Sequence, residues 1–222
     1  MARPWAVERA VGSAADLHGR ELREPMRRSV SVLEVDRPAL VLGSTQALTV
    51  ANGEALADAG VELVRRRSGG GAVLLVPGET LWVDVSLPRA DPLWDDDVAH
   101  ATHWLGRAWA GALGALGAEG RVHTGGLVRA RWSSLVCFAA LGPGEVSVGG
   151  RKVVGVAQRR TRAGARFQCA LHRSWRPGPL LALLHLDGGS AALAAAELAG
   201  VADGLDRPFD DVVDALLAQL RP

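Results

Sequence analysis

The sequence predicts one domain of the α/β (α+β) class, built as a largely antiparallel sheet flanked by helices. Three observations support this expectation. The length of 222 residues is enough for one large domain. The composition, with 48% hydrophobic and 22% charged residues, is that of a globular protein. Short apolar segments alternate with turn residues, and an Ala/Leu-rich helical tail follows them without a repeat or a linker.

Turn-forming residues divide the first ninety or so residues into short segments. Leu81 and Val83 alternate with Trp82 and Asp84, which predicts a strand with one buried face. Gly60 is a suitable C-cap for a preceding helix. The expected elements are strands over 30–35, 39–42, 61–64, 72–76 and 80–87, and a helix over 49–59.

Acidic residues mark the start of the longest predicted helix. The run 95–97 is Asp-Asp-Asp, which favours the positive N-terminal end of a helix over 98–116. Further along, Gly149 and Gly150 predict a tight hairpin. The remaining expected elements are strands near 135–138, 145–148, 151–158 and 165–171, and helices over 179–185, 191–198 and 209–220.

Charge and composition exclude several classes of protein. The 25 basic and 24 acidic residues nearly balance, so nucleic acid is not an expected partner. No apolar run reaches the roughly 18 residues of a membrane span, and residues 1–19 lack a leader-like apolar core, so we expect a cytoplasmic protein without a membrane partner. Cys137 and Cys169 are expected to be free thiols. His100 and His103 lack a matching acidic partner, so no metal site is expected.

Lys152 is the only lysine, beside 24 arginines. A lysine needed for charge alone could have been replaced by arginine, whereas a compact ammonium cannot be copied by a planar guanidinium. The chance survival of one lysine is the alternative. Lys152 begins an apolar strand, where its stem could lie beside Gly155 with the ammonium in a cleft. Alternatively, Lys152 could be a surface lysine at the rim of a hairpin.

A glycine-rich loop over 68–71 follows three arginines and lies between two predicted strands. Phosphate loops of the familiar kind lie between a strand and a helix, so a standard nucleotide fingerprint is excluded. The glycines let backbone approach a ligand closely, and the arginines could hold an anion. A flexible hairpin with solvated charges is the alternative.

Two segments together resemble the lipoate-protein ligase and octanoyltransferase family. RRRSGGGAV at 65–73 resembles its signature loop, and GGRKVVGVAQRR at 149–160 resembles its lysine-bearing strand. The resemblance covers about 30–172 and implies the catalytic fold of biotin and lipoate ligases, as a single domain over 1–222 with a helical tail over 178–222. It also implies attachment of a lipoyl or octanoyl group to a lysine of a lipoyl-carrier domain, of the 2-oxoacid dehydrogenase or glycine-cleavage type.

In the ligases of this family, ATP, with Mg²⁺, first converts lipoate to an acyl adenylate. The resemblance assigns Lys152 to the acyl carboxylate and later to the acyl-phosphate oxygen. Gly155, Ala157 and Gln158 would form the wall behind it. The residues that would line the acyl and adenylate pocket are Arg66, Ser68, Gly69, Gly70, Gly71 and Ala72.

The chain departs from the ligase pattern at several positions. Ligases commonly continue with His-Asp and then Gly-Asn, where this chain has Leu75-Val76 and Gly78-Glu79. Val156 replaces a serine, and the segment 168–170 is Gln-Cys-Ala where relatives often have His-Gly. These departures put the nucleotide contacts in doubt more than acyl binding.

A second branch of the family needs no ATP or other cofactor and moves octanoyl from acyl-carrier protein through a cysteine thioester. Cys137-Phe138, Glu145 and Lys152 resemble its Cys-Phe, acidic residue and lysine. Cys137 could instead be a small core residue. We expect the adenylating ligase first, the Cys137 transferase second, and a non-catalytic acyl- or carrier-binding protein third. The short tail leaves no accessory domain, which favours an accessory subunit or the transferase.

Overall fold

The computed structural model describes residues 4–21 and 25–220, so residues 1–3, 22–24 and 221–222 of the expected domain 1–222 lie outside it. Within the described residues, a seven-stranded sheet has the order β1-β2-β6-β10-β9-β8-β7. Every neighbouring pair is antiparallel except β1 and β2, so the sheet is largely antiparallel, as predicted. The strands are β1 (Ala6–Gly12), β2 (Ser29–Val35), β6 (Thr80–Pro88), β7 (Gly120–Val122), β8 (Val146–Val148), β9 (Arg151–Arg160) and β10 (Gly164–His172).

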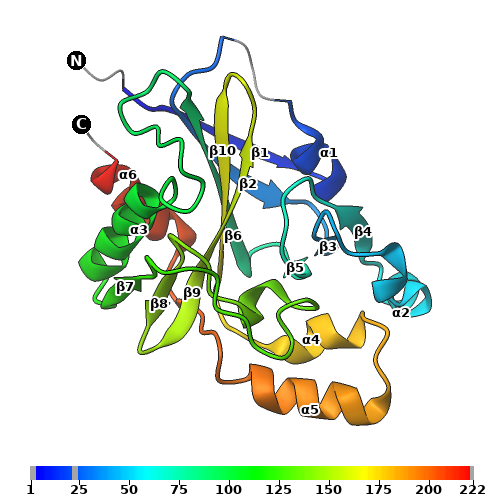
Figure 1. The fold of residues 1–222 in the computed structure, drawn as a ribbon. Helices are drawn as coiled ribbons and strands as arrows, with labels where there is room; N and C mark the ends of the chain where they lie inside the picture. The colour runs from blue at the N-terminus through cyan, green and yellow to red at the C-terminus, as the bar shows by residue number, and fades with distance from the viewer. Residues whose placement is uncertain (1–3, 22–24, 221–222) are drawn as a thin grey trace.

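Different layers cover the two faces of this sheet (Figure 1). Helices α3 (His103–Ala115) and α6 (Phe209–Gln219) pack on one face, with Trp109 and Phe167 buried between them and the strands. A small sheet of order β4-β3-β5 packs with α1 (Ala14–Gly19) toward the other face. The small sheet consists of β3 (Ala39–Leu42), β4 (Glu62–Arg65) and β5 (Val73–Leu75).

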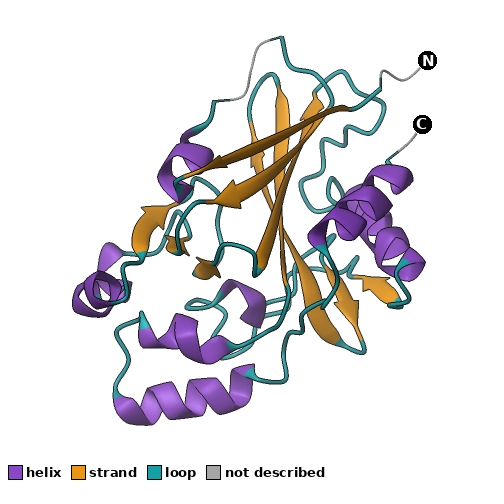
Figure 2. Cartoon of the chain, turned by 180° about the vertical axis from the view of Figure 1, so that it is seen from behind, coloured by secondary structure: helices purple, strands orange, loops and turns teal. Residues whose placement is uncertain are grey.

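Three further helices lie beside the small sheet, as the view from behind in Figure 2 also shows. They are α2 (Gly53–Asp58), α4 (Pro177–Ala182) and α5 (Gly188–Leu198), and they share a core with β3. The C-terminal helices therefore confirm the predicted helical tail. In the described part of the chain, no helix is long and apolar enough to cross a membrane.

Strand β6 is buried on both faces, so the expectation of one solvated face is wrong. Val83 and Val85 face the α3 and α6 layer. Trp82 and Asp84, which point the other way, are each only 4% exposed. Alternation of apolar and polar residues is typical of a half-buried strand, but here the small sheet and α1 cover the second face.

Two predicted elements near the glycine-rich loop differ from the structure. Residues 135–138 do not form a strand: only Val136 bridges to Ala72, and the chain then turns into the short 3-10 helix η2 (Cys137–Ala139). The helix expected over 49–59 is interrupted, because the Asn52 side chain accepts from Ala55 N and starts α2 at Gly53. A short 3-10 helix, η1 (Leu48–Val50), precedes it.

The structure also differs from the prediction in the first residue of α3 and in three elements that were not predicted. Helix α3 begins at His103 rather than at residue 98, because Asp97 binds Ala99 N and Ala101 N in a preceding turn. β1, α1 and β7 were not predicted at all. The tight hairpin at Gly149-Gly150 is confirmed, with φ of 56° and 80° at the two glycines.

Candidate active site

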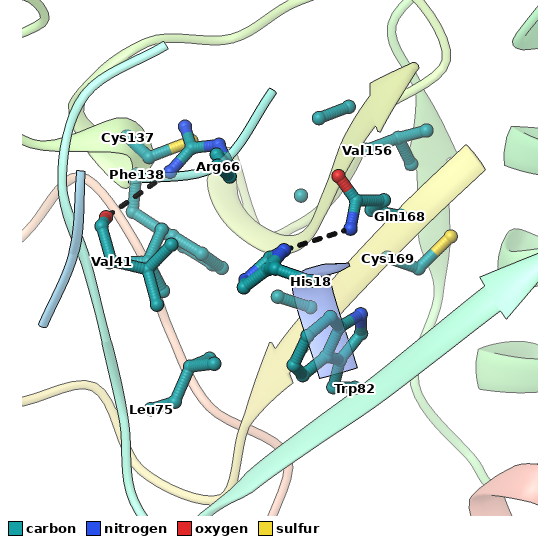
Figure 3. A pocket seen from close by; sticks show the side chains of 14 residues that line it. His18, Val41, Arg66, Leu75, Trp82, Cys137, Phe138, Val156, Gln168 and Cys169 are labelled. Carbon is teal, nitrogen blue, oxygen red and sulfur yellow. Dashed lines mark hydrogen bonds between the residues drawn. The ribbon is translucent and has the colours of Figure 1, made fainter. Parts of the chain in front are cut away.

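A narrow apolar cavity lies between the seven-stranded sheet, the small sheet, α1 and η2. Its volume is about 60 Å³, and Figure 3 shows its side chains. Trp82 and Gln168 come from the large sheet, Val41 and Leu75 come from the small one, and Phe138 comes from η2. The composition of the wall suits an alkyl chain better than a charged group.

A wider cleft of about 1130 Å³ adjoins this cavity. The glycine-rich loop, the segment around Arg129 and Arg131, and Lys152 line it. The three residues that line both spaces are Cys137, Val156 and Ala157. Cys137 therefore stands where the narrow cavity opens into the cleft.

Arg66 holds the glycine-rich loop in place. Its guanidinium is buried, and Nη2 donates to the carbonyls of Gly69, at 2.7 Å, and Gly71, at 2.9 Å. Nη1 donates to Val41 O at 3.3 Å, across the narrow cavity's wall. Three backbone carbonyls accept from this guanidinium, so Arg66 fixes the loop, and its binding of an anion stays a prediction.

The loop packs directly on the turn that carries Cys137. A Cβ added at Gly71 would lie 2.6–2.8 Å from backbone atoms of Val136 and Cys137, so that no side chain fits. Ala72 lines neither space, but it fixes this contact: Cys137 N donates to Ala72 O, and Ala72 N donates to Leu135 O.

Lys152 is buried, with 3% exposure, and its ammonium has three acceptors. Nζ donates to Cys137 O at 3.1 Å and to Ala140 O at 3.0 Å, and it pairs with Glu145 Oε2 at 2.7 Å. An ammonium has three hydrogens to donate. Lys152 therefore fixes the turn that carries Cys137 through two backbone carbonyls, and it places a positive charge beside this turn.

Gly155 and Phe138 pack beside the side chain of Lys152. The stem lies beside Gly155, whose added Cβ would be 3.4 Å from Lys152 Cε, as the sequence suggested. Nζ also lies 4.9 Å from the centre of the Phe138 ring. Glu145 is held in turn by Gly142 N at 2.7 Å and Val156 N at 3.1 Å.

The two thiols differ in environment. Cys137 is partly exposed at the junction of the two spaces. An added Cβ at Gly70 would lie 2.9 Å from Arg66 Nη2 and 3.4 Å from Cys137 Sγ, so the guanidinium and the sulfur flank the same glycine. Cys169 is buried on the α3 side, and burial raises the pKa of its thiol to about 12. Only Cys137 is placed for chemistry.

The sequence did not identify His18, which lines the narrow cavity from α1. Ser68 lines neither space, but Ser68 Oγ donates to Gln168 Oε1 at 3.0 Å. Gln168 Nε2 in turn lies 3.2 Å from His18 Nδ1. No apolar periodicity or motif marks the segment before residue 20, so nothing in it indicated a site residue.

The remaining predicted site residues lie along β9. Gly155 lines the narrow cavity, Ala157 lines both spaces, and Gln158 lines the cleft, where its Nε2 donates to Val98 O at 2.7 Å. In residues 4–21 and 25–220, no three His, Cys, Asp or Glu side chains gather where they could hold a metal ion.

Substituting Gly70 with alanine should weaken acyl binding at this junction. Gly70 has a φ of 99°, which is strained for alanine by about 1–3 kcal/mol, and the new Cβ would displace Arg66. We expect a loss of tenfold or so in affinity for an octanoyl or lipoyl amide, measured by calorimetry. Gly69→Ala is the matched control, because an added Cβ there meets nothing within 4 Å. Equal affinities in the two variants would contradict this role of Gly70.

His172 should make the protein sensitive to acid. Burial, and then the charge of Lys152, lower the pKa of His172 from 6.5 to about 4. Stability from this neutral group is fully present above pH 6.5 and is lost as the pH falls through about 4, a loss of about 3 kcal/mol. Urea unfolding between pH 7 and 4 would measure it. A His172→Phe variant should lose less stability over this range, and an identical pH profile would contradict the assignment.

Comparisons with known proteins agree on one family and one fold. A family model described as the lipoyl protein ligase A/B catalytic domain matches residues 4–219. No curated protein matches the sequence.

Among solved structures, the chain is similar to one from a Thermoplasma acidophilum lipoylation system, described as a bi-partite lipoate protein ligase and its E2 lipoyl domain. The TM-score is 0.73 at 16% identity, over 98% of this chain and 83% of that one. It is also similar to a T. acidophilum structure with bound lipoic acid (TM-score 0.68, 18% identity, 99% and 85% coverage). A third match is lipoate-protein ligase A bound with ATP (TM-score 0.67, 15% identity, 99% and 84% coverage). At these identities, the likeness is one of fold.

Proposed function

The chain belongs to the lipoyl protein ligase A/B catalytic-domain family, and from this premise we propose that it transfers a medium-chain acyl group, lipoyl or octanoyl, to a lysine of a lipoyl-carrier domain, with Cys137 as the relay. One observation carries this proposal: Cys137 lies where the narrow apolar cavity meets the wide cleft. An acyl chain in the cavity would place its carbonyl at this thiol. The cleft would then admit first the donor and later the carrier lysine.

The proposed reaction has two balanced steps. In the first, the sulfur of Cys137 attacks the carbonyl of an acyl thioester on a carrier protein. The bond from that carbonyl to the donor sulfur breaks, and the donor leaves as a thiol with the proton lost by Cys137. In the second, the amine of the carrier lysine attacks the Cys137 thioester, and an amide forms. The amine proton returns to sulfur and regenerates the thiol.

Lys152 and Glu145 support this route by positioning. Since Nζ holds the carbonyls of Cys137 and Ala140, it fixes the turn that presents the thiol. Its positive charge, paired with Glu145 on one side, would lie near an acyl carbonyl bound at Cys137, where negative charge develops during transfer. The Arg66 guanidinium adds positive charge on the other side of Gly70.

An adenylating ligase is the second candidate, and the size of the cleft favours it. The cleft of about 1130 Å³, with the glycine-rich loop and with Arg129 and Arg131, has room for a nucleotide. In this route, Cys137 would not react, and Lys152 would give up one acceptor to bind the acyl carboxylate. Of the described residues that line the cleft, Glu145 is the only carboxylate, and it is committed to Lys152, so the residues present do not fit Mg²⁺.

The proposed acceptor is a lipoyl domain of the 2-oxoacid dehydrogenase or glycine-cleavage type. The T. acidophilum neighbour is a bi-partite ligase described with its E2 lipoyl domain, which supports a lipoyl carrier and leaves room for an accessory subunit. A non-catalytic acyl- or carrier-binding role is less well supported, because Cys137 and Lys152 are both in place at the mouth of the cavity.

A transfer assay tests the proposal. The full chain is incubated with a lipoyl domain and either octanoyl-acyl-carrier protein without ATP, or lipoate or octanoate with ATP, and the mass of the lipoyl domain is measured. We expect acylation in the first mixture. Acylation only in the second would favour the ligase, and acylation in neither would contradict both.

A further inference from the structure

His18 is a polar residue in the wall of an otherwise apolar cavity. Its imidazole lies 4.3 Å from the centre of the Trp82 ring, at an angle of 33°. Figure 3 shows it among the lining residues, with Gln168 on one side and the Trp82 ring below. Nothing in the proposed transfer of the acyl group requires a histidine at this place.

The partners of Gln168 determine where the proton of His18 lies. The Gln168 carbonyl Oε1 accepts from Ser68 Oγ at 3.0 Å. With Oε1 committed to Ser68, the NH₂ group of Gln168 faces His18 Nδ1, which is 3.2 Å away. Since Nδ1 accepts from Gln168, a neutral imidazole carries its hydrogen on Nε2.

This Nε2–H group has no partner within the described part of the chain. The atom is buried from solvent, and no described side chain or carbonyl accepts its hydrogen. Burial, with the charges of Arg66 and Arg166, lowers the pKa of His18 to about 3, so the ring is neutral at physiological pH. A buried donor without an acceptor is unfavourable, and a ligand that supplies an acceptor gains by removing that cost.

We propose that His18 selects the acyl group, by favouring a chain that carries polarizable acceptor atoms, such as the dithiolane sulfurs of a lipoyl group, over the plain alkyl chain of octanoyl. This inference rests on the proposed function, since it treats the narrow cavity as the acyl site. A sulfur can accept weakly from Nε2–H and can also contact the neighbouring Trp82 ring favourably. An octanoyl chain would cover the donor without pairing it.

Lipoamide and octanamide test this inference, since they carry the two chains without a reactive carboxylate and need neither ATP nor a carrier. Their affinities for the full chain are measured by calorimetry. We expect lipoamide to bind about tenfold more tightly. In a His18→Leu variant, this preference should fall by about the same factor, and octanamide should bind no more weakly than before.

Two further variants separate selection from packing. His18→Gln keeps an N–H donor and should retain part of the preference. Leu75→Val changes the apolar wall of the same cavity without touching the donor, so it measures how far packing alone moves the ratio of the two affinities. We expect a smaller change than in His18→Leu, and an equal or larger change would overturn the role of His18. Melting temperatures of all variants show whether the fold is kept.

The outcomes distinguish the role of His18 from the proposed transfer. A preference that is the same in the wild type and in His18→Leu, or a wild type that prefers octanamide, would overturn the role of His18 and leave the proposed transfer standing. Binding of neither amide would overturn the assignment of the acyl cavity, and with it the proposed function.

Discussion

A Lys152→Met variant is expected to lose acyl transfer by a factor of about 100–1000 and to be less stable than the wild type. The loss of activity follows because the turn of Cys137 would lose its clamp, and the reacting carbonyl would lose a neighbouring positive charge. The loss of stability, about 3–5 kcal/mol, follows because Glu145 would remain buried without its cation. Single-turnover acylation of a lipoyl domain and urea unfolding measure the two effects.

A second pair of variants separates chemistry from folding. Adding Glu145→Gln to Lys152→Met removes the unpaired charge, so that stability should recover in part while transfer stays lost. Lys152→Arg keeps the charge, but a planar guanidinium cannot meet the same three acceptors, and it should also be nearly inactive. A stable Lys152→Arg variant with full activity would show that this lysine is not needed for the reaction.

Cys137→Ser should abolish transfer from octanoyl-acyl-carrier protein. A serine hydroxyl is a far weaker nucleophile than a thiol when no base activates it, so we expect at least a 1000-fold loss or so. When the wild type is exposed to octanoyl-acyl-carrier protein without a lipoyl domain, it should accumulate an acyl thioester on its own chain. Peptide mapping by mass spectrometry would place that adduct on Cys137.

Cys169→Ser is the matched control for this experiment. Cys169 also lines the narrow cavity, but its thiol is buried in the core on the α3 side of the large sheet. Its substitution should therefore cost some stability and leave most of the transfer activity in place. If Cys137→Ser keeps full activity with lipoate and ATP, and if no thioester forms on the wild type, the adenylating route is correct and Cys137 is a wall residue.

The fold was predictable where local patterns agree with the tertiary environment. The strands at 29–35, 80–88 and 164–172 and the hairpin at Gly149-Gly150 follow from apolar runs and turn residues. β1 was not predictable in this way, because it is a largely exposed edge strand without an alternating pattern and is ordered by pairing with β2. The turn at η2 was mistaken for a strand because Leu135 and Val136 are apolar, although only one residue there finds a strand partner.

The site was predictable in its two glycine-rich segments and not in its walls. The resemblance identified Lys152 and Arg66, but the contacts of both with backbone carbonyls depend on tertiary structure. His18 lies 150 positions from its partner Gln168, and its short helix has no distinctive pattern. A polar residue that becomes part of an apolar cavity through such a contact leaves no signal in the local sequence.

A crystal structure with an octanamide that carries bromine on its terminal carbon would test the assignment of the acyl site. We expect a bromine anomalous signal inside the narrow cavity, among Leu75, Trp82 and His18, with the amide carbonyl at Cys137. An octanamide that binds instead along the wide cleft, or beside β1 of the large sheet, would contradict the assignment of the acyl site.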